Sequence, residues 1–550
     1  SKDHNFLPGE TVQKQLIVIN NSRVTLTADC QWSFGLPRAM TGSKTITLPT
    51  GEQERIPLAF ELPAGLAQGQ YVVKATVKFS NGETQEDSFA IDVLPKPESV
   101  RVAGRIALFD PKGETAKLLK GMGIRCEPVD AGADLSGYAI LVIGKGALTL
   151  DGRAPRISGV PDGLKVVIFE QTTEVLEKRF GFRVAERGMR WVFKRVPDHP
   201  LLAGIAEEHL RNWRGDATIL PPRGTYGMTY HSPMSKWCDI TVTQRWRCGN
   251  RGNVASALIE KPPCGDFLPI LDGGYALQYT SLMEYREGAG MVLFCQADVT
   301  GRTEADPAAE TLARNILGYV SDWQPAPRRT VVYAGEAAGR QHLEATGLSP
   351  AAYGRGGLSA DQVLVVGPGG GQQLARNAAA ITNWVQAGGH VLAVGLSGDE
   401  ASAFLPLSVR TTQAEHIAAH FEPFGVGSAL AGVSPAEVHN RDAGELPLVS
   451  AGATAVGNGV LAVAEDANVV FCQLAPWHLD YSGEKMNIKR TFRKVSYCTT
   501  RLLANMGAAG KTPLLDHVSR PVREGETRWL DGLYLDVPEE WDYPYRFFRW

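Results

Sequence analysis

The sequence has no long hydrophobic run, no excess of charge of one sign and no cysteine pair at metal-binding spacing. No window approaches the roughly eighteen apolar residues of a membrane helix, so we expect no membrane segment. Lysine and arginine number 56 against 59 aspartates and glutamates, which excludes the basic surface of a dedicated nucleic-acid binder. The eight cysteines contain no Cys-x-x-Cys pair, and we expect no metal and no other cofactor. Cys238, Cys248 and Cys264 share one segment and are either free thiols or part of a disulfide or metal site.

The length and composition are those of a multi-domain globular chain. The 550 residues exceed a typical domain of ~150 several-fold, and 44 % apolar residues suffice for ordinary hydrophobic cores. The 59 glycines and 33 prolines are typical of a chain rich in strands and turns. The first residues carry no charged-then-apolar signal segment, and we interpret the chain as a fragment of a longer polypeptide. The compartment stays open, and secretion or export to the periplasm is compatible with this interpretation.

Residues 1–97 show short alternating apolar and polar runs separated by turn residues, with hardly any helical periodicity between them. This pattern predicts an antiparallel β-sandwich of the immunoglobulin-like type, followed by a proline-containing linker at residues 94–98. The expected strands cover residues 15–19, 25–28, 56–60, 71–79 and 89–93.

The remainder reads as an α/β pattern that occurs twice. An apolar strand ending in glycine at residues 141–146 has a counterpart at 364–369, and Phe-Cys-Gln at 294–296 returns at 471–473. Strands alternating with helices predict two open, mostly parallel α/β domains, at residues 98–325 and 326–510. The first copy is the longer one, with an inserted segment at about 185–284. A single (β/α)8 barrel is a weaker alternative, because no helix fits between the strands near residues 141 and 166.

A helix, two glycines and a buried strand follow one another at residues 378–392, with an echo at 283–292. This phrase resembles the class I glutamine amidotransferase-like fold, which has a flavodoxin-like sheet. In active members of that family a cysteine sits on the turn after this strand, activated by a histidine further along. The corresponding turns read Glu170-Gln171 and Gly395-Leu396-Ser397-Gly398, and His478 has no nucleophile to activate. Thiol catalysis is therefore not expected.

The segment between residues 205 and 305 contains aromatic residues beside asparagine, aspartate and arginine. Sugar sites use this composition, because a flat apolar ring stacks on the pyranose while polar groups bind its hydroxyls. We favour the alternative in which arginine and aspartate pair with each other and the aromatic residues brace a long loop. The candidate substrate-binding residues are Trp213, Arg214, Asp216, Asn250, Arg251, Asn253, Asp266, Asp272, Tyr275, Arg302 and Glu304.

Carboxylates in the same region are candidates for a glycosidase acid and nucleophile. Such a pair must lie ~5–5.5 Å apart in retaining enzymes or ~6.5–9.5 Å apart in inverting ones, which a sequence does not reveal. We prefer the interpretation that they are ordinary surface carboxylates. The candidates are Asp216, Asp266, Asp272, Glu284, Glu287 and Glu304.

The C-terminal extension, residues 511–550, ends with seven aromatic residues among the last seventeen. So many aromatic side chains need a surface to cover, on this chain or on a neighbouring one. This composition indicates a larger assembly, and we expect a homo-oligomer.

A sandwich followed by amidotransferase-like domains without their nucleophile resembles the non-catalytic C-terminal half of large bacterial glycoside hydrolases of the β-galactosidase type, families 2 and 42. The phrases that carry this resemblance lie at residues 212–216, 249–253, 283–296 and 545–550. These families place two catalytic glutamates on a barrel, and the resemblance implies a barrel on the same or another chain. It also implies that this chain supports assembly and the active site of an enzyme acting on carbohydrate. The alternatives are a self-contained carbohydrate hydrolase with its site in residues 205–305 and a carbohydrate-binding protein without turnover.

Overall fold

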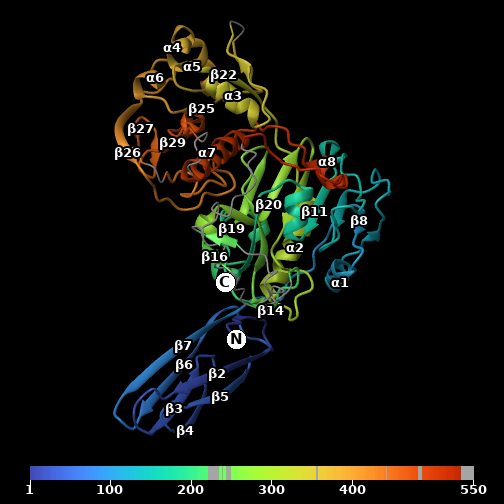
Figure 1. The fold of residues 1–550 in the computed structure, drawn as a ribbon, viewed down its shortest axis with the longest axis vertical. Coiled ribbons are helices and arrows are strands. Elements are labelled where there is room, and N and C mark those ends of the chain that lie inside the picture. The colour runs from blue at the N-terminus through green and yellow to red at the C-terminus, as the bar shows by residue number, and fades with distance from the viewer. Residues whose placement is uncertain are drawn as a thin grey trace.

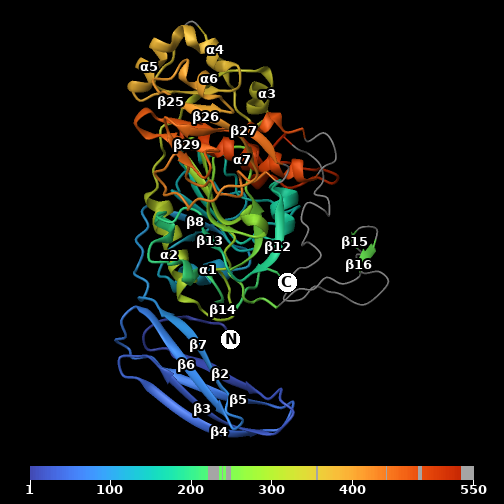
Figure 2. The same cartoon turned by 90° about the vertical axis from the view of Figure 1, so that its left-hand side faces the viewer.

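Three parts follow one another along the long axis of the computed structural model (Figure 1). A β-sandwich lies at one end, a first α/β part lies in the middle and a second α/β part at the other end, as the turned view also shows (Figure 2). The prediction of a multi-domain chain built largely from sheets is confirmed. In the described part of the chain, no helix is both long and apolar enough to cross a membrane. The structure describes residues 1–220, 235–237, 240–242, 249–354, 357–440, 443–480 and 486–533.

The N-terminal part consists of two sheets packed face to face. Alternation places Ile56, Leu58 and Phe60 on the inner face of one sheet, where the Phe60 ring lies 5.0 Å from that of Phe34 in the other. A strand at residues 40–48, rich in threonine and mostly exposed, adds to the five that the sequence predicts. The larger sheet has the order β1 (Asn5–Phe6), β7 (Thr84–Val93), β6 (Gly69–Phe79), β3 (Leu26–Phe34) and β4 (Met40–Leu48), and the smaller one contains β2 (Thr11–Ile19) and β5 (Gln53–Glu61).

The first α/β part has a ten-stranded sheet whose core strands are parallel and apolar throughout. Parallel strands are buried on both faces, which explains why residues 140–143 and 166–169 read as continuous apolar runs. The sheet has the order β12 (Val184–Met189), β18 (Ala255–Glu260), β20 (Tyr279–Glu287), β21 (Gly290–Cys295), β11 (Lys165–Phe169), β10 (Ile140–Ile143), β8 (Ile106–Phe109) and β9 (Glu127–Pro128), with β19 (Phe267–Gly273) beside β20 and β13 (Phe193–Lys194) beside β19. Its helices are α1 (Glu114–Gly121) and α2 (Pro307–Asp322).

The second α/β part repeats this strand order and confirms the internal repeat. In both sheets five parallel strands are followed by an antiparallel neighbour, β20 beside β21 and β29 beside β30. Two separate open sheets exclude the single-barrel alternative. The second sheet has the order β23 (Ala351–Ala352), β22 (Thr330–Ala334), β24 (Gln362–Val366), β25 (His390–Val394), β30 (Val469–Cys472), β29 (Leu461–Ala464) and β28 (Thr454–Val456). Around it lie α3 (Ala337–Ala345), α4 (Gly370–Leu374), α5 (Ala378–Gln386), α6 (Gly398–Ser402), α7 (Met486–Asn505) and the hairpin β26 (Arg410–His416) with β27 (Gly444–Ala451).

The predicted echo of the helix–glycine–glycine phrase at residues 283–292 is wrong. These residues form a β-hairpin, in which β20 turns at Gly288 and Ala289 into β21 and Glu287 pairs with Gly290. Gly288 has φ +59°, and a Cβ atom at this position would clash with the backbone of Pro161, so the turn favours glycine. Methionine and glutamate suit helices, but here burial between neighbouring strands decides the conformation.

Short strands and helical turns complete the inserted segment and the loops. The segment from residue 184 to residue 287 runs from β12 through β20, so most of its strands extend the first sheet on its antiparallel side. Its other strands are β14 (Trp213–Asp216), β15 (Ser235–Trp237), β16 (Ile240–Val242) and β17 (Arg251–Gly252). The short helical turns are η1 (Val160–Asp162), η2 (Val175–Arg179), η3 (Pro200–Leu202), η4 (Glu207–Leu210), η5 (Tyr275–Leu277), η6 (Ala375–Asn377), η7 (Glu465–Ala467) and η8 (Pro476–His478).

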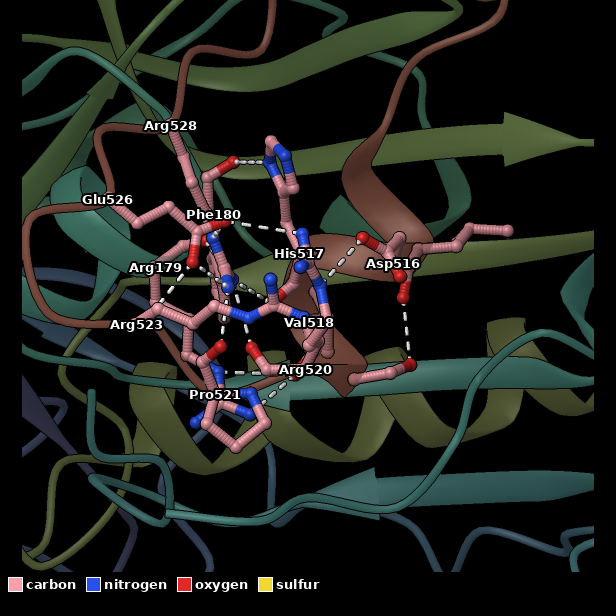
Figure 3. Close-up of polar contacts among 12 residues, drawn as sticks. Arg179, Phe180, Asp516, His517, Val518, Arg520, Pro521, Arg523, Glu526 and Arg528 are labelled. Atoms are coloured by element: carbon pink, nitrogen blue, oxygen red, sulfur yellow. Dashed lines mark hydrogen bonds and ion pairs between the residues drawn. The ribbon is translucent and has the colours of Figure 1, made fainter. Parts of the chain in front are cut away.

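The chain returns to the first α/β part after α7. We call residues 511–533, which include α8 (Leu514–Ser519), the C-terminal strap (Figure 3). The fully buried guanidinium of Arg179 donates to the carbonyls of Val518 in the strap and Gly152 in the first α/β part, both at 2.8 Å. Arg528 donates back to the carbonyl of Arg179 at 3.3 Å and to that of Arg520 at 2.9 Å. The aromatic residues beyond residue 533 lie outside the described residues.

Candidate functional site

Trp213, the aromatic residue expected to offer an exposed face, is fully buried. Its Nε1 donates to the carbonyl of His209 at 2.8 Å, and the guanidinium of Arg302 lies 5.6 Å from its ring centroid. Arg302 also donates to the carbonyls of Asn253 at 2.7 Å and Gly215 at 3.1 Å. Arg302 and Trp213 therefore brace the loops of the insertion, as a buried arginine does when backbone carbonyls satisfy its donors.

Two arginines of the insertion pair with the N-terminal sandwich. Arg214 contacts Glu10 at 2.9 Å, and Arg251 contacts Asp3 at 2.8 Å and Glu304 at 2.7 Å. These ion pairs lie at the junction of the sandwich and the first α/β part, so they position one part on the other.

The other polar candidate residues near the junction with the sandwich are also buried or hydrogen-bonded to the protein itself. The amide of Asn250 donates to the carbonyl of Leu220 at 2.7 Å, and Asn253 is buried. The backbone N–H of Asp216 donates to the hydroxyl of Thr303 at 2.7 Å.

The two buried aspartates at the opposite end of the insertion face the second α/β part. Asp266 accepts from Arg328 at 2.8 Å and lies 3.0 Å from Arg501. Burial alone would raise the pKa of Asp266, but Arg501, Arg286 and Arg328 hold it below its ordinary value. Asp266 is therefore a fixed anion inside a cluster of arginines.

Asp272 is fully buried between two cations of the same α/β part. It accepts from Arg195 at 2.6 Å and Lys261 at 3.1 Å, and Lys261 in turn contacts Glu437 of the second α/β part at 2.9 Å. We call these four residues the Asp272 network. The network joins β19 and its neighbours to a loop of the other α/β part.

The predicted substrate-binding residues thus form two groups at different ends of the first α/β part. One group meets the sandwich and the other meets the second α/β part, as the order of the parts in Figure 2 makes clear. The side chain of Tyr275 lies outside the described residues. In both groups arginine side chains pair with carboxylates, as expected from the alternative in which these residues pair with each other and do not contact sugar.

A buried polar cluster lies at the carboxyl ends of the parallel strands in the first sheet, where open α/β sheets bind ligands. Glu170, directly after β11, accepts from the N–H of Thr300 at 2.6 Å, and Lys145 after β10 donates to the carbonyl of Thr300 at 3.0 Å. Burial, with a further contribution from Asp298, raises the pKa of Glu170 to about 8. Glu170 is therefore a carboxylic acid that keeps its proton at neutral pH. The sequence signal here is a glutamate directly after an apolar run at residues 166–169, which marks its position but not its pKa.

Glu170→Gln is expected to flatten the pH dependence of stability between about pH 5 and about pH 8. The unfolded carboxyl loses its proton near ~4.3, whereas the folded one keeps it up to about 8. The folded state then binds more protons, so the free energy of unfolding falls as pH rises, by at most about 1.4 kcal/mol per pH unit. Glutamine keeps the acceptor for Thr300 but has no proton to lose. Urea unfolding across this range measures the slope, with exposed Glu174→Gln as the control, and equal slopes for wild type and Glu170→Gln would contradict the assignment.

A carboxylate and a histidine contact each other at the carboxyl ends of the parallel strands in the second sheet. The Oε1 atom of Glu336, after β22, accepts from Trp477 Nε1 and lies 2.5 Å from His478 Nε2. Ser397 accepts from the N–H of Glu400 at 3.3 Å and caps α6. His478 thus has a partner that orients its ring, and the serine on the neighbouring turn serves as a helix cap.

The sequence left open whether Cys238, Cys248 and Cys264 are free thiols or part of a disulfide or metal site. Cys264 is a buried free thiol 3.6 Å from the carbonyl of Leu530, whereas Cys238 and Cys248 lie outside the described residues. Within the described ranges, no group of three or more histidine, cysteine, aspartate or glutamate side chains is arranged to hold a metal ion.

No protein-family model and no curated protein matches the chain. Among solved structures, it is slightly similar to β-glucuronidase 2 of Bacteroides uniformis, with 12 % identity, 30 % of this chain and 22 % of that chain covered, and a TM-score of 0.15. A family 123 glycoside hydrolase from Clostridium perfringens has 9 % identity, 22 % and 27 % coverage, and a TM-score of 0.13. The sporulation control protein Spo0M of Bacillus subtilis has 16 % identity, 16 % and 45 % coverage, and a TM-score of 0.14. The chain thus spans less than half of each of these proteins. Glycoside hydrolases are among its weak structural neighbours, and scores this low carry no argument about function.

Proposed function

We propose that this chain is the non-catalytic portion of a β-galactosidase-type glycoside hydrolase, supporting its assembly and its active site. The observation that carries the proposal is the use of the charged side chains in the insertion. Arg214 and Arg251 pair with the sandwich, whereas Asp266 pairs with Arg328 and Arg501 at the other end. A catalytic carboxylate must face its substrate, but these face guanidinium groups that tie three parts of the chain together. The arrangement suits a rigid support.

The topology supports the finer domain assignments that belong to this proposal. The five parallel strands of each sheet follow the order 2-1-3-4-5 of flavodoxin-like folds. We assign an immunoglobulin-like sandwich to residues 1–97, amidotransferase-like domains to 98–325 and 326–510, and an extension to 511–550. The partners in this proposal are carbohydrate, a catalytic barrel on the same or another chain, and further copies of the chain.

A self-contained carbohydrate hydrolase is the second candidate, and one observation favours it. Glu170 has a pKa raised to about 8 beside Asp298, which lies in the 205–305 region. Glycosidases use a pair of carboxyls, one of which is protonated and acts as the acid. Both side chains are buried in this structure, so a substrate would have to open the site.

The test is an assay of purified residues 1–550 against a panel of chromogenic glycosides. The support proposal expects no turnover by the chain alone, and a catalytic barrel encoded upstream in the same reading frame. Turnover that survives repurification and disappears in Glu170→Gln, but not in Glu304→Gln, would replace it with the second candidate. Calorimetric binding of neutral sugars without turnover would favour a carbohydrate-binding protein instead.

A further inference from the structure

A cavity with a volume of about 1200 Å³ lies between the two α/β parts. Its walls come from β20, from the C-terminal half of α2, from the linker at residues 324–329 and from the end of α7. Crevices between domains are preferred positions for small-molecule sites. The cavity is lined by polar groups as well, among them Tyr319, Asn505 and His390.

The charged lining of this cavity contains one more basic than acidic residue. Four arginines line it against the carboxylates of Asp266, Asp322 and Glu465. Asp266 is already engaged from behind by Arg501, a residue outside the lining. The basic lining residues are Arg286, Arg314, Arg328 and Arg329.

The partners of these arginines show which of them is available to a ligand. Arg286 is held by Glu284 at 2.5 Å and Arg314 by Glu310 at 2.6 Å. Arg329 differs, because its Nη1 donates to the carbonyl of Met506 at 2.8 Å, and no carboxylate among the described residues pairs with it. A half-buried guanidinium without a counter-ion is a strong donor to an incoming oxyanion.

Arg328 and His390 stand beside Arg329 in the lining. Arg328 is adjacent in the chain, contacts Asp266 through Nη1 and keeps 35 % of its side chain exposed. Burial and the nearby positive charge of Arg329 lower the pKa of His390, so this ring is a neutral hydrogen-bonding group at neutral pH. All three residues line the cavity, and the positive charge of Arg329 reaches the ring of His390.

We propose that the cavity between the two α/β parts binds a small ligand through a carboxylate or phosphate group held by Arg329 and Arg328. Arg329 supplies the unpaired charge, and Arg328 adds a second guanidinium on the solvent side. The oxyanion belongs either to an acidic saccharide or to free phosphate, and both present the same oxygen atoms to the arginines. The site does not depend on whether the chain supports a glycoside hydrolase.

Isothermal titration calorimetry on the whole chain tests the site with three probes: glucuronate, inorganic phosphate and glucose. We expect heat from at least one of the two anions and none from glucose, which has the same ring without the charge. Glucuronate alone would identify a saccharide source, whereas phosphate alone would identify a free oxyanion.

Arg329→Gln is expected to weaken the binding of the anion by about tenfold or more, and Arg329→Lys to restore part of it. Arg376→Gln, which removes an exposed arginine outside the cavity, is the matched control and should leave binding unchanged. Circular dichroism of each variant verifies folding. Silence with both anions, equal binding of glucose, or undiminished binding in folded Arg329→Gln would overturn the proposal.

Discussion

Asp272→Ala is expected to lower the free energy of unfolding by about 3–5 kcal/mol. The substitution removes the shared anion of the Asp272 network and leaves Arg195 and Lys261 as buried cations. Glu437 can then balance only one of them, through its 2.9 Å contact with Lys261. The free-energy cost of a buried charge without a partner is larger than the stabilisation that the intact pair contributes. Removing one member therefore destabilises the protein by more than the pair stabilised it.

Urea-induced unfolding followed by intrinsic fluorescence measures this change. Glu174→Ala is the matched control, because Glu174 also pairs with a lysine but both side chains are 58 % exposed. Exposed pairs of this kind contribute about 0.3–0.5 kcal/mol, so the control transition should hardly move. A loss in Asp272→Ala no larger than that of the control would show that water reaches the Asp272 network.

The Asp272 network could not have been predicted from the sequence, because its members are far apart in the chain. Asp272 and Arg195 are 77 positions apart, and Lys261 and Glu437 are 176 positions apart. The same aspartate read as a candidate sugar contact, since an aspartate beside glycine and an aromatic residue looks alike in either role. Periodicity describes a residue's own neighbourhood, whereas an ion pair depends on what the fold brings opposite it.

The parallel strands at the centre of both sheets could be predicted, because their pattern depends on their own residues and not on distant partners. Strands buried on both faces must be apolar along their whole length. The apolar runs at residues 140–143 and 363–366 therefore predict strands even when the neighbouring strands are not known. The first strand of the hairpin at residues 279–295, β20, escaped prediction because Leu282, Met283 and Glu284 are good helix formers. Pairing with both neighbouring strands overrides that preference, and only the sheet order reveals it.

Glu170 could be predicted only in part from the sequence. Its position directly after a buried strand was predicted from the apolar run that precedes it. Its raised pKa depends on complete burial and on Asp298, which is 128 positions further along the chain. Such an environment is set by the packed fold, so no pattern around residue 170 could report it.

Arg179→Met is expected to destabilise the protein by about 3 kcal/mol or more and to release the C-terminal strap. Methionine preserves much of the side-chain volume but leaves the carbonyls of Val518 and Gly152 without their donor. Hydrogen bonds from charged donors contribute about 1.5–3 kcal/mol each, and buried carbonyls without a donor are costly. Burial and the neighbouring Arg528 lower the pKa of Arg179 to about 10, so it remains a cation at neutral pH.

Limited proteolysis separates release of the strap from global unfolding, because a freed strap is cut within residues 511–533 while the α/β parts stay intact. Arg520→Met is the control in the same region, since Arg520 pairs with Asp516 at 3.1 Å and 38 % of its side chain is exposed (Figure 3). Arg528→Met should resemble Arg179→Met, because Arg528 donates to the carbonyl of Arg179. The double variant should then lose less than the sum of the single losses, because both side chains hold the same strap and its release by one substitution already breaks the contacts of the other. Protection of the strap in Arg179→Met would mean that α8 is held by its apolar packing through Leu514 and Val518. Strict additivity would mean that the two arginines act independently of each other.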